Sequence, residues 1–480
     1  ENLHGLEIDP RCTQIAAFNL ALTAWKFCEH YKELPEMNLA CSGIAPKGKV
    51  EDWVKLIGNV ENENDRYRIE NGMRALYDHF QLAPELGSLL DPTTIEADAF
   101  TASFDQLQPV LKKALENERD NEVLERGVMA AGIAKAGEIL SKKYWLQITN
   151  VPYLSRGKQE KNISDYCEKN FFEAKGDLAT VFLDKMLKSN STGGTTCSVI
   201  PQNWLFLTSY KKFREKLLKN DTWNLVARLG TKGFQTPMWD FNVMLIAITH
   251  QNPLPTHNLT GLDMLEAINA AAKDEALKTA ELKTVNQKEQ LGNPDAGIIL
   301  GNIDTTTKLL TNYAKPFTGI QSGDNPKHFF LFWEFSDLKE WDFIQRTTES
   351  TIFYGGLEQV VSYQNGKGRL NKEPGAVLRN IECRGKSGFI VHRMGNLPTT
   401  IFTGELIDQN AAVIIPIKKE NYLPLWCYLS SNDYSKNVRK IDKKLGVTPA
   451  TLGKVPFDLE YWKQVATEKY PNGLPEPYSD

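Results

Sequence analysis

Several features that mark common protein classes are scarce in this 480-residue sequence. Lys and Arg number 56 against 60 Asp and Glu, so the net charge of −4 offers no global positive field, and an anionic partner must meet a local patch. The seven cysteines include no Cys-x-x-Cys pair, and only Cys28 and His30 lie close together. This spacing argues against a structural zinc site or a disulfide scaffold and fits a reducing, cytoplasmic compartment.

Long apolar runs are also missing. The stretch Val243–Ile248 is far too short to span a bilayer, so we expect no membrane partner. Nothing at the start of the sequence resembles a signal peptide, and the chain begins without Met, so we expect it to be an internal piece of a longer protein. There is no Gly-x-Ser-x-Gly elbow, and we find no metal-ligand or nuclease constellation.

What is present is the composition of a soluble globular protein, with 41% hydrophobic and 24% charged residues. The patterns predict three parts: a catalytic α/β domain over 1–257, a helical connector over 258–296, and a strand-containing α+β domain over 297–480. The connector is predicted to contain a long amphipathic helix from Gly261 to Gln290. From residue 361 to the end, 17 Lys and Arg face 12 Asp and Glu, a modest local excess of positive charge.

Strand and helix patterns alternate in the first part, which predicts a mostly parallel sheet covered by helices. A turn is expected at Ser191–Gly194, before a strand at Thr195–Ile200. The other expected strands are Leu3–Ile8, Trp145–Thr149, Trp223–Leu229 and Asn242–His250, and the expected helices are Pro10–Lys26, Asp177–Lys188 and Ser209–Lys219.

The tetrapeptide Asn150–Tyr153 directly follows one of these strands. Ligands of open α/β sheets bind beyond the carboxyl ends of the strands. The Asn150 side-chain carbonyl and the Val151 backbone carbonyl can accept hydrogen bonds from a planar NH₂ group, Tyr153 can stack on its heterocycle, and Pro152 keeps Val151 extended. Such a pocket suits direct methylation of an amine, although this motif alone is most often an ordinary turn.

An acidic strand end lies near the start of the chain. Glu7 and Asp9 close the strand Leu3–Ile8, and an acid in this position commonly accepts hydrogen bonds from ribose hydroxyls. Each has a structural alternative: Glu7 can interact with the dipole of the next helix, and Asp9 can cap that helix before Pro10.

Taken together, these motifs resemble those of the amino-methylating, S-adenosylmethionine-dependent DNA methyltransferases, above all the PglX-type adenine methyltransferases of BREX phage-exclusion systems and related single-chain restriction–modification enzymes. The resemblance covers nearly the whole chain. The matching segments are Gly5–Pro10, Asn150–Leu154, Asp177–Ala179 and Pro201–Leu205, and in the second domain Gly395–Pro398, Phe402–Glu405, Lys454–Leu459 and Pro471–Tyr478.

The resemblance implies a Rossmann-like methyltransferase domain followed by a target-recognition domain. It implies methylation of the N6 amine of adenine in double-stranded DNA, with the base flipped out of the duplex and with further phage-defence subunits as partners. Catalysis would involve the residues of the tetrapeptide. The remaining predicted roles are cofactor binding by Glu7, Asp9, Ser88 and Leu89, stacking on the target base by Phe241 and Trp239, and DNA contacts by Arg379, Arg384, Lys386 and Arg393.

Two departures from the family pattern qualify this prediction. Val151 stands where Pro is usual, which leaves the backbone carbonyl but loosens the loop. The glycine-rich donor-binding loop expected before Glu7 is absent, so we expect these residues alone to bind S-adenosylmethionine poorly. Two alternatives stay open: a methyltransferase acting on RNA or on a protein glutamine, and a non-catalytic DNA-binding specificity protein.

Overall fold

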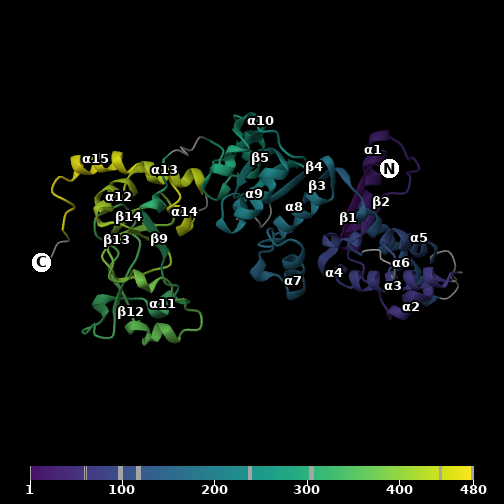
Figure 1. The fold of residues 1–480 in the computed structure, drawn as a ribbon, viewed down its shortest axis with the longest axis horizontal. Coiled ribbons are helices and arrows are strands. Elements are labelled where there is room, and N and C mark those ends of the chain that lie inside the picture. Colours follow the sequence, from purple (N-terminus) through teal and green to yellow (C-terminus); the bar gives the residue numbers. More distant parts are fainter. Residues whose placement is uncertain are drawn as a thin grey trace. The chain divides into compact units, whose positions relative to one another are not determined.

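The computed structural model describes residues 2–58, 60, 62–95, 101–114, 121–235, 241–301, 307–442 and 446–476. The chain forms two compact units, which we describe separately (Figure 1). Unit 1 contains Glu1–Pro201 and Leu245–Asn252, and unit 2 contains Gln202–Met244 and Pro253–Asp480.

Unit 1 combines parallel strands with helices. Its helices are α1 (Pro10–Cys28), α2 (Val50–Val54), α3 (Glu63–Gln81), α4 (Ala83–Leu86), α5 (Phe104–Ala114), α6 (Asn121–Ser141), α7 (Lys161–Asn170) and α8 (Leu178–Lys188). Its strands are β1 (His4–Glu7), β2 (Asn38–Cys41), β3 (Tyr144–Asn150), β4 (Asn190–Pro201) and most of β6 (Val243–Thr249).

The first β–α–β segment follows from local sequence. Asp9 caps α1 by accepting a hydrogen bond from the Arg11 amide, and Pro10 occupies the first turn, where no donor is required. The helix lets the chain return, so β1 and β2 pair in parallel with Glu7 opposite Cys41. In the same way β3 and β4 pair in parallel, with α7 and α8 between them in the sequence, and β6 lies beside β4.

Unit 2 begins with α9 (Lys211–Asn220) and the parallel strands β5 (Thr222–Gly230) and β7 (Asn258–Asp263), to which β8 (Lys283–Asn286) adds antiparallel. Two further sheets follow, in the orders β14-β13-β16-β9 and β10-β12-β11-β15. Their strands are β9 (Ala314–Thr318), β10 (Phe330–Leu331), β11 (Asp342–Gln345), β12 (Gln359–Val361), β13 (Gly388–His392), β14 (Thr399–Phe402), β15 (Leu406–Ile407) and β16 (Ala411–Pro416).

Helices near the chain end cover the β14-β13-β16-β9 sheet (Figure 1). They bury an aromatic core that includes Phe389, Trp426, Tyr428 and Phe457. The remaining helices of unit 2 are α10 (Ala270–Thr279), α11 (Asn325–His328), α12 (Tyr422–Leu429), α13 (Asn432–Ile441), α14 (Pro449–Leu452) and α15 (Leu459–Lys469). In the part of the chain that the structure describes, no helix is long and apolar enough to span a membrane.

The expected α/β class, followed by a strand-containing α+β region, is confirmed, but two local predictions are wrong. The predicted helix Gly261–Gln290 contains only the short α10, because Asn258–Asp263 pairs with β5 and Lys283–Asn286 pairs with β7. The predicted turn Ser191–Gly194 lies inside β4, where Gly193 has φ +87° and the register with β3 shifts between Tyr144 and Leu146. Glycine tolerates this backbone, so the strand continues through an irregularity instead of ending.

Candidate active site

The tetrapeptide lies at the carboxyl end of β3, as predicted. Asn150 is the last residue of this strand and is exposed, whereas the Val151 side chain is 4% exposed and anchors the loop in the interior. The Tyr153 hydroxyl donates a hydrogen bond to Asn150 Oδ1 over 3.3 Å. The structure therefore brings together the amide oxygen and the aromatic ring proposed to hold the amine.

A second segment of unit 1 holds this loop in place. Asp177 caps α8 by accepting a hydrogen bond from Ala179 N at 3.0 Å, and the same oxygen accepts one from Leu154 N at 3.3 Å. Leu178 N donates to the Leu154 carbonyl at 3.0 Å, which adds a backbone connection between the two segments. The capping aspartate thus joins the start of α8 to the loop after β3.

Burial affects the acid–base properties of both side chains. Removal from water raises the pKa of Asp177 above its ordinary value, because burial disfavours the carboxylate. Burial also raises the pKa of Tyr153 to about 12, and the nearby Asp177 carboxylate adds to this effect. Tyr153 therefore keeps its proton at neutral pH and acts as the donor to Asn150.

Glu7 lies at the carboxyl end of β1. Its Oε1 atom accepts hydrogen bonds from Ile8 N at 2.8 Å and Asp9 N at 3.3 Å, which orients the carboxylate. Within the described residues, no hydrogen bond involves the second oxygen, Oε2. Glu7 thus has one acceptor in use and one available to a hydroxyl group.

Asp9 is engaged by its own helix. Its carboxylate caps α1 and accepts hydrogen bonds from the Arg11 side chain, including one from Nη2 at 2.7 Å. These hydrogen bonds from Arg11 lower the pKa of Asp9 to about 2. The helix-capping alternative is therefore confirmed for Asp9, and cofactor binding by this residue stays a prediction.

The segment that contains Ser88 and Leu89 packs against the end of β1. At Gly87, where φ is +51°, an added Cβ would lie 3.0 Å from Ile8 Cδ1, so only glycine fits here without adjustment. Leu89 is buried, and its carbonyl accepts a hydrogen bond from the Tyr166 hydroxyl of α7 at 3.0 Å. The segment thus connects the Glu7 strand end to the helices that follow β3.

An ion pair reinforces this connection. Asp91 contacts the buried Lys185 of α8 at 2.6 Å. Burial alone would raise the pKa of Asp91, but the Lys185 ammonium outweighs it and keeps that pKa below its ordinary value. The same helix, α8, therefore holds the Asn150 loop at its first turn and the 87–91 segment at its last.

The first residues of β1 and β3 lie close together. The rings of His4 in β1 and Tyr144 in β3 are 5.6 Å apart. Beyond their carboxyl ends, the 87–91 segment, α7 and α8 form the continuous set of contacts described above. Glu7 and Asn150 are therefore linked through one set of contacts within unit 1.

The remaining predicted residues lie in unit 2 or outside the described residues. Phe241 is exposed next to Asn242, whose carbonyl accepts a hydrogen bond from Gln202 N at 2.9 Å. Trp239 lies outside the described residues, so its predicted stacking role has no structural description. Base stacking by these two residues stays a prediction.

The predicted DNA contacts fall into two pairs. Arg384 forms an ion pair with Asp342, and Arg393 donates to the Val447 and Gln409 carbonyls at 2.8 and 2.9 Å. Arg379 and Lys386 are exposed and form no ion pair within the described ranges. Arg384 and Arg393 thus bind other residues of the protein, whereas Arg379 and Lys386 are exposed to solvent.

Sequence reasoning missed the role of Asp177 as the connection between the loop and α8, and the pairing of Asp91 with Lys185. An Asp directly before an apolar helix was a usable signal for the cap. No local signal indicated the ion pair, because its partners lie 94 positions apart. In the described part of the chain, no group of three or more His, Cys, Asp or Glu side chains is arranged to hold a metal ion.

Comparison with known proteins matches residues 1–234 to the Eco57I restriction-modification methylase family. The chain is 26% identical over 240 residues to the adenine-specific methyltransferase PglX of Lacticaseibacillus casei (strain Zhang), a match that covers 49% of this chain and 19% of PglX. It is 24% identical over 254 residues to the adenine-specific methyltransferase BrxX of Escherichia coli O9:H4 (strain HS), covering 48% and 20%. The chain thus spans about a fifth of the length of these curated relatives.

Solved structures with partial similarity include the ATP-dependent Type ISP restriction-modification enzyme LlaBIII bound to DNA, with a TM-score of 0.47 and 10% identity over 100% of this chain and 38% of that one. The DrdV–DNA complex has a TM-score of 0.47 and 10% identity over 99% and 55% of the two chains.

The family match covers both strand ends described above, including the motif Asn150–Tyr153 and the acid Glu7. Residues 1–234 are therefore similar to the Eco57I restriction-modification methylase family.

Proposed function

We propose that this chain is part of a site-specific DNA methyltransferase that transfers a methyl group from S-adenosylmethionine to the N6 amine of adenine in double-stranded DNA, in restriction–modification or phage defence. The observation that carries the proposal is the exposed Asn150 at the end of β3, hydrogen-bonded to Tyr153, in a segment that matches the methylase family. The proposal includes the division into a catalytic domain (1–257), a connector (258–296) and a target-recognition domain (297–480).

The chain's own residues would activate the amine by accepting hydrogen bonds from its two N–H groups. Asn150 Oδ1 takes one N–H, and the Val151 backbone carbonyl takes the other, which increases electron density on the nitrogen. Tyr153 stacks on the flipped base while its neutral hydroxyl remains in reach of Asn150. The buried Val151 side chain holds the loop, a role that the ring of Pro would otherwise share.

The residues at the end of β1 fit part of a donor site. Glu7 presents an unpaired carboxylate oxygen that can accept a ribose hydroxyl, and the segment with Ser88 and Leu89 packs beside it. When bound, S-adenosylmethionine supplies the methyl group. These residues would bind and orient the donor on the same side of unit 1 as Asn150.

The exposed edge of β3 supports the further proposal that the donor site is completed by another segment. One edge of β3 pairs with β4, and no strand among the described residues pairs with the other. This strand exposes three large apolar side chains: Trp145 (72%), Leu146 (56%) and Ile148 (75%). Large apolar side chains on an open strand edge favour association with another element. We propose that a part of the same polypeptide outside these 480 residues covers this edge and carries the glycine-rich donor loop.

Residues 297–480, which lie in unit 2, would recognise the DNA target, with other phage-defence subunits as additional partners. Lys386 and Arg379 remain candidates for contacts with phosphate, since both are exposed. Arg384 and Arg393 would instead support the surface that carries such contacts, because each already binds within the protein.

The catalytic assignment is tested with Asn150→Ala in a longer protein that contains this sequence. We expect methylation of DNA to fall below detection while DNA affinity changes by less than about twofold, because Asn150 acts on the amine and carries no charge. Asn64→Ala, at an exposed Asn of α3 in the same unit, is the matched control and should methylate normally. Retained methylation in Asn150→Ala would remove the catalytic assignment.

Calorimetric titration with S-adenosylmethionine tests the completion of the donor site. The 480-residue chain should bind much more weakly than the longer protein, since it lacks the proposed loop. Equal affinity of the two proteins would contradict the proposal for the β3 edge.

A further inference from the structure

Helix α13 has one buried face and one polar face. Its buried side chains Tyr434, Val438 and Ile441 recur at helical spacing and pack into the core of unit 2. Lys436 and Lys440, which are one turn apart, are exposed. Four residues of helix correspond to about 6 Å along the axis, so the long side chains at these two positions can reach one anionic group or two adjacent ones.

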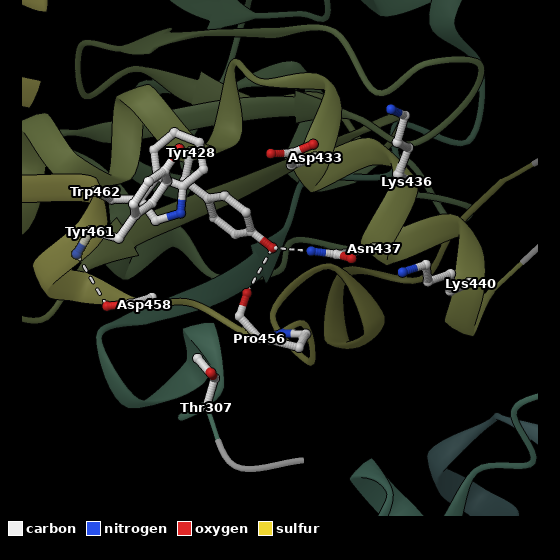
Figure 2. A pocket seen from close by; sticks show the side chains of 10 residues that line it. All are labelled: Thr307, Tyr428, Asp433, Lys436, Asn437, Lys440, Pro456, Asp458, Tyr461 and Trp462. Atoms are coloured by element: carbon white, nitrogen blue, oxygen red, sulfur yellow. Dashed lines mark hydrogen bonds between the residues drawn. The ribbon is translucent and has the colours of Figure 1, made fainter. Parts of the chain in front are cut away.

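These two lysines line a pocket of about 420 Å³ between α13 and α15. Figure 2 shows Lys436, Asn437 and Lys440 on one side and the rings of Tyr461 and Trp462 on the other. A pocket of this volume is within the range of small-ligand sites. It therefore offers two cations and an aromatic wall to a single ligand.

The pocket has a rigid floor. The Tyr428 hydroxyl donates to the Pro456 carbonyl at 2.8 Å and accepts a hydrogen bond from Asn437 Nδ2 at 3.3 Å. The rings of Tyr428 and Trp462 lie 5.2 Å apart, and both side chains are buried. In contrast, Tyr461 at the rim is 52% exposed, which leaves one face available for contact.

Neither lysine side chain is held by another residue. Within the described ranges, the ammonium groups of Lys436 and Lys440 form no ion pair and no hydrogen bond. Asp458 also lines the pocket, but its carboxylate caps α15 by accepting hydrogen bonds from the amides of Glu460 and Tyr461 at 3.1 Å. Asp433 remains as an exposed negative charge in the first turn of α13.

We infer that this pocket binds a phosphate group of the DNA backbone through Lys436 and Lys440, with Tyr461 packing against the adjacent sugar or base. This inference rests on the proposed function, because it adds a DNA contact to the proposed target-recognition unit. Two lysines one helical turn apart suit a phosphate, which lysine commonly binds as a point charge. The exposed ring of Tyr461 beside them offers an apolar surface to a deoxyribose of the same strand.

The test measures the salt dependence of DNA binding by the 480-residue chain, with fluorescence anisotropy of a labelled duplex. Binding to phosphate needs no recognition sequence, so any duplex is suitable. Lys436→Gln/Lys440→Gln should reduce the slope of log K against log salt by about 1 to 2, which at 0.1 M salt corresponds to about 8-fold to 60-fold weaker binding. Asp433→Asn should bind about threefold more tightly, because it removes one negative charge near the phosphate.

Two control variants distinguish the pocket from net charge. Lys436→Arg/Lys440→Arg keeps both cations and should retain the parental slope. Lys278→Gln/Lys339→Gln changes the net charge of unit 2 equally, but each of these lysines is already paired with a carboxylate at about 3 Å. It should therefore leave the slope nearly unchanged.

The outcomes separate this inference from the proposed function. An unchanged slope in Lys436→Gln/Lys440→Gln, or an equal loss in the Lys278/Lys339 control, would overturn the phosphate pocket alone. If the parent chain binds no duplex DNA at low salt, the proposed target recognition by unit 2 fails, and the pocket assignment fails with it.

Discussion

Replacing Asp177 with Ala removes two hydrogen bonds that join α8 to the loop after β3. The lost cap at Ala179 N costs about 1 kcal/mol, and the lost bond to Leu154 N costs about 0.5 to 1 kcal/mol more. We therefore expect the free energy of unfolding of unit 1 to fall by about 1.5 to 2 kcal/mol. For a unit of roughly 200 residues, this corresponds to a decrease in Tm of about 3 to 8 °C.

Asp177→Asn is the matched control, because Asn accepts the same hydrogen bonds and is an equally good N-cap. Its free energy of unfolding at pH 7, measured by urea titration with circular dichroism, should stay within about 0.5 kcal/mol of the parent. If Asp177→Ala is as stable as the parent, or Asp177→Asn is as unstable as the Ala variant, the argued role of the acceptor is wrong.

The pH dependence of the same pair tests the raised pKa of Asp177. Burial raises the folded-state pKa above the unfolded value of about 4, so ionisation opposes folding. The contribution to stability is full below pH 4 and is lost as the pH rises through the folded pKa. The stability of Asp177→Asn relative to the parent should therefore increase from pH 3 to pH 7, and a decrease over this window would contradict the assigned direction.

Two other substitutions test burial elsewhere. Arg214 is fully buried and donates hydrogen bonds to the main-chain carbonyls of Trp204, Leu207, Asp295 and Ala296. Arg214→Met should therefore lower the free energy of unfolding of unit 2 by about 3 to 5 kcal/mol, measured by urea unfolding. A loss below about 1 kcal/mol would contradict this. Tyr153→Phe tests the raised pKa of Tyr153. The difference between the ultraviolet absorbance titration curves of the parent and of this variant should show one tyrosine with a pKa of about 12. The contribution of this group to stability is full below the unfolded pKa of about 10 and is lost as the pH rises through 12. A difference titration centred near pH 10 would show that the ring is not buried.

Local patterns in the sequence were sufficient to place the main features of unit 1. The strand before Asn150 and the helices that follow Asp9 and Asp177 occur where apolar periodicity predicts them, and Asp9 caps its helix as its sequence position indicates. These features are local, because a cap or a strand end depends on residues within a few positions. The motif order also predicted the family match of residues 1–234.

Interactions between distant residues were decided only by the tertiary structure. The segment Gly261–Gln290 has helical spacing, yet its first residues pair with β5, because hydrogen bonds to another strand outweigh a weak local preference. Among the cations of unit 2, Arg384 meets Asp342 from 42 positions away, whereas Lys436 and Lys440 meet no carboxylate in the described part of the chain. The sequence by itself determined which residues can accept an amine and which carry positive charge. Folding decided which of them stay available to a ligand, because burial and pairing depend on neighbours that only the three-dimensional arrangement supplies.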